Sequence, residues 1–190
     1  MLRMIEIRPL DDIMKVYGRR LDRLGSRAAV HRVIARAANY EGRKAYTRVK
    51  RVLRQQTSIP AKVVNANTRF VPASTTGGAV QVMITGSGKG ISLKEFGAKQ
   101  NARGVTARVW GKAKQFPGGF MGPKPGAIAA KLKGHAFHRT SKKRHPIKKM
   151  FGPGIAKELI KDQSKAEFYA AQPLIIARVG TEIAAVLRGY

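Results

Sequence analysis

The sequence of 190 residues contains no cysteine, which excludes disulfide bonds and thiolate metal sites and fits a reducing compartment. It also lacks long apolar runs. No signal-peptide-like segment opens the chain, and the best candidate for a membrane span, residues 173–187, is interrupted by Arg178 and Glu182. We therefore expect a soluble protein without a membrane anchor.

Acidic residues are far fewer than basic residues: the chain has ten Asp and Glu against 38 Lys and Arg. Not one acid occurs between Gly97 and Ala156. General acid–base catalysis and metal-assisted hydrolysis both need clustered carboxylates, so this scarcity argues against an enzyme and against a small-molecule substrate. We expect no catalytic residues, no cofactor and no metal site.

Two short motifs resemble functional sites but lack the residues that such sites need. The stretch from Thr85 to Gly90 is rich in glycine, as a phosphate loop is. The phosphate-loop pattern, however, needs Gly five residues before Gly88, where Met83 stands, and Ser or Thr at the position of Gly90, so a glycine-rich turn is the better interpretation. His135 and His138 are three residues apart, and on a strand such residues point to opposite faces. Without nearby Cys or carboxylates they form no zinc site.

What the chain has in excess is positive charge, with a formal net charge of +28. A charge imbalance of this size gives information about binding partners rather than about the fold. A polyanion is the usual partner, because contacts to phosphates release condensed counterions. An anionic membrane and acidic assembly neighbours are the alternatives.

The residue pattern predicts an α+β fold: a long N-terminal helix, a small antiparallel β-sheet with extended loops, and C-terminal helices. The division is a helical part (1–60), a β-rich basic part (61–150) and C-terminal helices (151–190), within one domain. Expected helices cover residues 11–25, capped by Asp11 and Asp12, then 26–55, capped by Ser26, and at the end 155–169 and 173–188. Expected strands cover 5–8, 69–71, 79–84, 105–110, 127–132 and 135–139, with turns at 75–78 and 86–90 and an irregular stretch at 117–125.

The helix expected at residues 26–55 carries two stripes, one mostly apolar and one cationic. The apolar stripe comprises Val30, Ile34, Ala37, Glu41, Ala45, Val49 and Val52. The basic residues that are candidates for contacting DNA or a partner are Arg32, Arg36, Arg43, Lys50 and Arg54 on this helix, and Lys142, Lys143 and Arg144 in a loop. The alternative for both groups is a solvated surface.

Three phenylalanines, Phe116, Phe120 and Phe137, lie among the basic residues of the second half. Aromatic rings in such surroundings stack on nucleic-acid bases in some proteins. More often they anchor loops to a core, and we favour that interpretation here.

Five blocks of residues follow one another between positions 91 and 153 in a characteristic order. The blocks are Ile91-Ser92-Leu93-Lys94-Glu95-Phe96-Gly97-Ala98-Lys99-Gln100, Gly104-Val105 leading into Val109-Trp110, Phe116-Pro117-Gly118-Gly119-Phe120, His135-Ala136-Phe137-His138-Arg139, and Lys143-Arg144-His145-Pro146-Ile147 running on to Phe151-Gly152-Pro153. In order and spacing they resemble the minor tail protein Z family of tailed bacteriophages, also called tail completion proteins. Members of that family often follow the last Gly-Pro pair with Ser, where this chain has Gly154.

The resemblance implies a structural virion protein at the head-proximal end of the tail, assembled in the host cytoplasm. It implies a role in tail maturation, head–tail joining and DNA delivery. The expected form is a ring of several copies around the DNA passage. Expected partners are other neck and tail proteins, such as the tail terminator, tail tube or head–tail connector, and DNA passing non-specifically. From another class, the alternative is a basic RNA- or DNA-binding module of ribosomal or nucleoid type.

Overall fold

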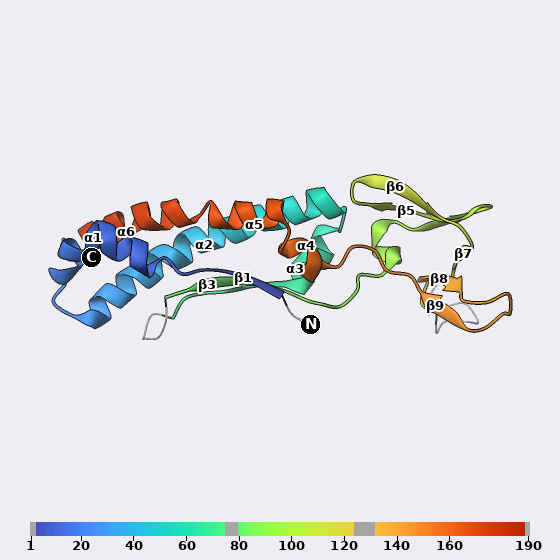
Figure 1. The fold of residues 1–190 in the computed structure, drawn as a ribbon, viewed down its shortest axis with the longest axis horizontal. Helices are drawn as coiled ribbons and strands as arrows, with labels where there is room; N and C mark the ends of the chain where they lie inside the picture. The colour runs from blue at the N-terminus through green and yellow to red at the C-terminus, as the bar shows by residue number, and fades with distance from the viewer. Residues whose placement is uncertain (1–2, 75–79, 124–131, 189–190) are drawn as a thin grey trace.

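The computed structural model describes residues 3–74, 80–123 and 132–188. Figure 1 shows an elongated molecule with helices and one sheet along most of its length and two small sheets at one end. We call residues 3–90 and 154–188 the helical body and residues 91–153 the β end. The expected α+β class is confirmed, with a long N-terminal helix, small antiparallel sheets and C-terminal helices.

The helical body contains the α-helices and one sheet. Its helices are α1 (Leu10–Asp22), α2 (Arg27–Thr57), α3 (Ala61–Asn67), α4 (Ile155–Leu159), α5 (Asp162–Tyr169) and α6 (Gln172–Leu187). Its strands are β1 (Arg3–Ile7), β2 (Thr68–Val71) and β3 (Val82–Gly86), in the order β1-β3-β2 with antiparallel pairing. Helices α5 and α6 lie alongside α2, and the sheet runs beneath them (Figure 1).

The β end begins with a 3-10 helix, η1 (Leu93–Phe96), followed by two three-stranded antiparallel sheets. One is β4 (Lys99–Asn101), β5 (Gly104–Val109) and β6 (Lys112–Phe116); the other is β7 (Gly119–Met121), β8 (Ala136–Arg139) and β9 (Ile147–Lys149). The expected turn at 75–78 and most of the expected strand at 127–132 lie outside the described residues.

Helix α2 follows the prediction closely. The Ser26 side chain accepts a hydrogen bond from the Ala29 amide at 3.1 Å, as an N-cap residue does. Most of the expected packing stripe is buried, although Val30 and Val52 at its two ends are only half-buried.

The start of α1 differs from the expectation. Asp11 and Asp12 do not cap the helix; Pro9 occupies the N-cap position and no side chain makes a capping hydrogen bond. Both acids lie in the first helical turn, where the positive end of the helix dipole favours carboxylates. Asp12 also accepts a hydrogen bond from Gln172 at 2.6 Å, which joins α1 to α6.

Several short elements were not predicted. Helix α3 follows Pro60, where the chain was expected to leave helical structure, and the 155–169 pattern divides into α4 and α5. Strand β7 crosses the stretch expected to be irregular, and β4, β6 and β9 are additional strands. Strands β4, β6 and β9 are three to five residues long and mostly polar, so their pairing comes from their neighbours rather than from an apolar alternation.

The C-terminal helices also correct an expectation about length. Residues Gln163–Leu187 are long and apolar enough to cross a membrane by length and composition, and an 18-residue window within them has a mean hydropathy of 1.4. The pattern was underestimated because α5 leads almost directly into α6. Polar contacts tie this segment to α2: Glu167 accepts from Arg48 at 2.6 Å, and the Arg178 guanidinium lies 4.2 Å from the Tyr40 ring centre.

One hydrophobic core extends through both parts of the molecule. It includes Leu53 and Ile34 of α2 and reaches Leu93 and Val105 in the β end. The β end is therefore attached by buried apolar contacts as well as by chain connections.

Candidate nucleic-acid interface

The five basic residues predicted on the long helix form a single stripe on α2. At 100° per residue, Arg32, Arg36, Arg43, Lys50 and Arg54 fall within an arc of about 40°, and at 1.5 Å per residue they span about 33 Å. Four are exposed and Lys50 is half-buried. None of the five forms an ion pair within the described ranges of the chain. The stripe therefore presents positive charge without an acidic partner of its own.

Two members of the stripe are held in place by neighbours. Lys50 donates to the Asn65 amide oxygen at 3.1 Å and lies 4.6 Å from the Tyr46 ring centre. Arg43 lies 5.8 Å from the ring of Phe70, which itself stacks on Tyr46 at 6.0 Å. Lys50 is thus held by a side chain of α3, and Arg43 lies near a ring of β2.

The second predicted group lies in the loop that joins β8 to β9. Lys142, Lys143 and Arg144 are all exposed. The loop backbone is fixed from within: Arg139 donates to the Arg144 carbonyl oxygen at 2.8 Å, and the Thr140 hydroxyl donates to the Pro146 carbonyl oxygen at 3.2 Å. The three basic side chains therefore project from an ordered loop.

The stripe and the loop are separate surfaces. The stripe follows the helical body, whereas the loop lies at the far tip of the β end (Figure 1). A ligand that touches both must be extended along the molecule, as a nucleic-acid strand or a large partner is.

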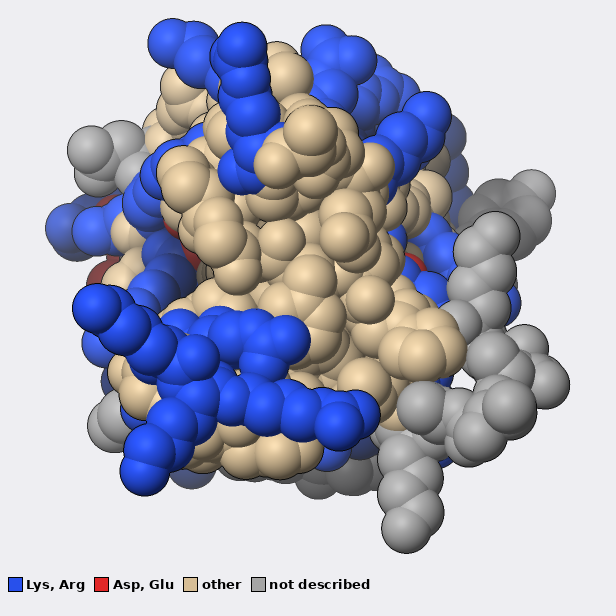
Figure 2. Space-filling model, turned by 90° about the vertical axis from the view of Figure 1, so that its right-hand side faces the viewer, with Lys and Arg blue, Asp and Glu red and all other residues tan. Residues whose placement is uncertain are grey.

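The β end carries a disproportionate share of the charge. It holds fifteen of the 38 Lys and Arg but only one of the ten acids, Glu95. Figure 2 shows this end from outside, with Lys and Arg around the periphery, other residues in the centre and little acidic surface. Every ion pair found in the described residues lies in the helical body. Among the described cations of the β end, Lys114, Arg139 and Lys149 lie near aromatic rings and Lys94 donates to a carbonyl oxygen, with no carboxylate paired to them.

Aromatic rings lie close to several of the basic side chains. The four exposed rings described in the structure each have a Lys or Arg within 6 Å of the ring centre, a distance at which the ring face attracts cations. They are Tyr40 with Lys44 and Arg178, Trp110 with Lys114, Phe151 with Lys149, and Tyr169 with Lys165. Nucleic-acid bases would compete with these cations for the same ring faces.

The three phenylalanines considered for base stacking are engaged in the fold. Phe137 is buried and stacks on Phe120, its cross-strand neighbour, at 6.0 Å. Arg139 lies 5.1 Å from the Phe120 ring, and half-buried Phe116 packs against the core. These positions agree with the anchoring role that we favoured.

The two histidines of the H-x-x-H motif have different surroundings. Both ring nitrogens of His135 have partners, Ser92 Oγ at 2.8 Å and Lys149 Nζ at 3.2 Å, while His138 is half-buried on β8. No group of three or more metal-ligating side chains was found in the part of the chain that the structure describes.

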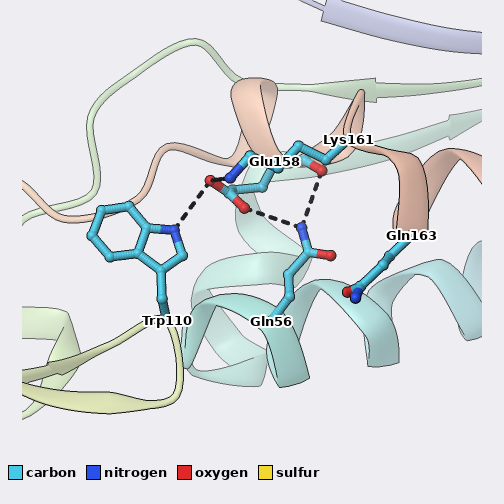
Figure 3. A pocket seen from close by; sticks show the side chains of 5 residues that line it. All are labelled: Gln56, Trp110, Glu158, Lys161 and Gln163. Atoms are coloured by element: carbon cyan, nitrogen blue, oxygen red, sulfur yellow. Dashed lines mark hydrogen bonds and ion pairs between the residues drawn. The ribbon is translucent and has the colours of Figure 1, made fainter.

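A hollow of about 460 Å³ lies where the β end meets the helical body (Figure 3). It is lined by Gln56, Trp110, Glu158, Lys161 and Gln163. Buried Glu158 accepts hydrogen bonds from Lys161 at 2.7 Å and from the Trp110 indole at 3.3 Å on one oxygen, and from Gln56 at 3.2 Å on the other. Because both oxygens are occupied, the carboxylate joins three segments rather than offering a free acceptor to a ligand.

The Trp110–Gly111 turn explains how the hairpin reaches this junction. Both residues have positive φ, 50° and 73°, as the two-residue turn of a β5–β6 hairpin requires. The Trp110 amide donates to the Thr57 carbonyl oxygen at 3.2 Å and the Gly111 amide to Ser58 Oγ at 3.0 Å. The hairpin tip thus satisfies a carbonyl group at the C-terminal end of α2, where helices leave such groups unpaired. The sequence did not predict this junction, nor the contacts of His135 with Ser92 and Lys149, because both join residues that are distant in sequence.

Comparison with known proteins gives no family for this chain. No protein-family model, no curated protein and no solved structure matches it.

Proposed function

We propose that this chain is a structural virion protein of a tailed phage, located at the head-proximal end of the tail. In this role several copies form a ring around the passage through which DNA moves. The ring contributes to tail maturation, head–tail joining and DNA delivery. The proposal assigns no catalytic step, cofactor or metal to the chain.

The resemblance to the minor tail protein Z family supports the proposal because its blocks fall within a definite part of the structure. They run from Ile91 to Pro153 and so include η1 and both small sheets, from β4 to β9. Two of their glycines are required by packing: a Cβ at Gly104 would clash with the Phe116 carbonyl oxygen, and one at Gly152 would lie 2.5 Å from the Phe96 ring. The blocks thus mark residues that a particular fold needs.

The observation that carries the proposal is the positive charge of the β end and the α2 stripe, which forms no ion pair in the described residues. Phosphate contacts supply affinity without sequence information and weaken with salt. A surface of this kind suits DNA that must pass regardless of its sequence. It also suits acidic patches on neighbouring neck and tail proteins, such as a terminator, tube or connector.

Ring formation must overcome the repulsion between copies that each carry +28. Interactions between exposed charges are screened beyond about 8–10 Å at physiological salt. Copies can therefore associate through apolar contacts if their basic regions point away from the interfaces. We expect monomers at low salt, and assembly when salt, DNA or an acidic partner reduces the repulsion.

The test mixes the purified protein with phage tails that lack it and examines them by negative-stain electron microscopy. The informative variant replaces Lys142, Lys143 and Arg144 with Glu. Its matched control replaces Arg20, Arg23 and Arg27 with Glu. These residues are exposed at the α1–α2 connection, and the control changes the net charge by the same amount. Circular dichroism verifies that both variants fold.

We expect density at one end of the tails with the wild-type protein, reduced attachment of the loop variant and retained attachment of the control. Equal attachment of the two variants would show that the loop is a solvated surface. Wild-type protein that ignores tails but binds short RNA tightly as a monomer would favour the alternative, a ribosomal or nucleoid-type module.

A further inference from the structure

Two separate segments of the β end contact the imidazole ring of His135, which precedes β8, and a lysine of η1 contacts the backbone next to it. Ser92, the buried residue before η1, places its Oγ 2.8 Å from Nδ1. Lys149 of β9 places its Nζ 3.2 Å from Nε2. Lys94 of η1 donates to the Lys133 carbonyl oxygen at 2.8 Å, two residues before His135. We call Lys94, Lys133, His135 and Lys149 the His135 cluster.

The hydrogen bonds determine the form of the ring. An ammonium group has donors only, so Nε2 of His135 must accept from Lys149. The proton of the neutral ring then resides on Nδ1, which donates to Ser92 Oγ. This arrangement exists only while His135 is uncharged.

The surroundings favour that neutral form. Burial lowers the pKa of His135 below its ordinary value of 6.5, and the charges of Lys149, Lys94 and Lys133 lower it further, while Glu95 opposes them. Because the folded-state pKa is depressed, the neutral ring stabilises the fold above about pH 6.5, and this contribution is lost as the pH falls through the folded-state pKa.

The cluster therefore places three lysines around one uncharged ring, with Glu95 as the nearby acid. Neither Lys94 nor Lys149 forms an ion pair within the described ranges, and each ammonium group has donors left over. Lys149 is further positioned by the Phe151 ring, whose centre lies 5.5 Å from its Nζ. Positioned donors from several segments are suited to a ligand with several acceptor oxygens and negative charge.

We propose that the His135 cluster binds one phosphate group of a nucleic-acid backbone, with Lys94, Lys149 and the imidazolium of His135 as donors. The choice of a backbone phosphate rests on the proposed function, in which DNA passes this end of the molecule. When the phosphate is bound, Nε2 of His135 takes up a proton and changes from acceptor to donor. Lys149 turns from the ring to a phosphate oxygen, so the anion removes the repulsion between the two cations.

The proposal predicts a linkage between phosphate and protons. A bound anion favours the charged imidazolium, so it raises the pKa of His135, and phosphate in turn binds more tightly as the pH falls. A rise of one pKa unit corresponds to a tenfold difference in affinity between the two protonation states.

The experiment follows the His135 ring signals of the full chain by NMR during pH titrations. The signals are assigned with a His135→Gln variant, since the chain contains four histidines. Titrations are done without ligand, with inorganic phosphate and with a short DNA duplex. We expect the duplex to raise the pKa of His135 by about one unit.

Two neighbouring lysines provide the test variants. Lys149→Gln removes a proposed ligand, whereas Lys148→Gln removes the same charge from an exposed neighbour on the same strand. The readout is the change in pKa that the ligand causes, because Lys149→Gln alone alters the starting pKa. We expect that change to be abolished by Lys149→Gln and kept by Lys148→Gln.

The arms of the experiment separate the possible outcomes. A response to duplex, alone or together with a weaker response to inorganic phosphate, supports a backbone-phosphate site. A response to inorganic phosphate but not to duplex overturns nucleic acid as the source. If the duplex binds but the pKa of His135 stays constant, or if the two lysine variants behave alike, the cluster is no phosphate site. The proposed function has a different readout, attachment to tails, so either can fail without the other.

Discussion

The helical body and the β end solve the problem of excess positive charge in different ways. In the helical body, acids are few but each described ion pair lies there, and buried acids are paired: Glu41 with Lys44 at 3.2 Å and Glu158 with Lys161 at 2.7 Å. The hydrogen bond to Glu41 raises the pKa of Lys44. In the β end, the cations that the structure describes form no ion pairs, and several contact rings or carbonyl oxygens instead. The acids of the helical body thus pair with bases of the same region, whereas the described cations of the β end form no ion pairs.

The largest expected effect tests whether the two regions are one folding unit. Leu53 is fully buried in the core that extends into the β end. Leu53→Ala should lower the free energy of unfolding by about 3 kcal/mol, through lost apolar burial and the cavity left behind. Hydrogen exchange should show reduced protection in β5 as well as in α2.

The control for that measurement is Val16→Ala, since Val16 is 60% exposed and its loss should change stability by less than about 0.5 kcal/mol. If Leu53→Ala weakened α2 and left β5 fully protected, the β end would be an independent unit.

A smaller effect is expected at the junction between the regions. Glu158→Ala removes the acceptor of the Trp110 indole, Lys161 and Gln56. We expect a loss of about 2 kcal/mol, because buried polar groups lose their partner. The emission of Trp110, the only tryptophan, should shift to longer wavelength as the ring becomes more exposed.

Glu182→Ala is the matched control, because Glu182 is also a partly buried acid paired with a base, Arg178, at 2.9 Å. It should destabilise α6 and leave the Trp110 emission unchanged. Equal spectral shifts in both variants would show that Trp110 reports general loosening rather than this junction.

The smallest expected effect is a change in hydrogen-exchange protection with salt concentration, which should differ between the two regions. Raising the salt concentration screens repulsion among unpaired cations, so the amides of β8 and β9 should gain protection against hydrogen exchange, by about 1 kcal/mol or less. The interior of α2 should change little, since its stability comes from apolar packing. Equal protection of both regions by added salt would show that the helical body and the β end do not differ in the repulsion among their cations.

The sequence predicts the elements that carry their own periodic signal. Helix α2 was predicted nearly residue by residue, because Ser26 caps it and apolar positions recur along one side. Strand β6 was missed because its residues, Lys-Ala-Lys-Gln-Phe, have no apolar face, and its place depends on the turn at Trp110–Gly111.

The residues of the candidate interface also differ in whether the local sequence predicts them. The positions of the α2 stripe and the exposure of Lys142, Lys143 and Arg144 follow from local sequence. The His135 cluster does not, because Ser92, His135 and Lys149 meet only after η1, β8 and β9 have come together. Contacts between distant segments are set by tertiary packing, which no local pattern encodes.

The short edge strands described above bear on how the free protein avoids aggregation. Strands β6 and β9 lie at sheet edges, where unpaired backbone groups invite another chain to add a strand. Each carries two lysines, Lys112 and Lys114 on β6 and Lys148 and Lys149 on β9, and charged edge residues oppose that addition. These lysines thus oppose the edge-to-edge joining of newly made copies. A polyanion that neutralises these lysines in the absence of the correct neighbours would remove that protection and lead to precipitation.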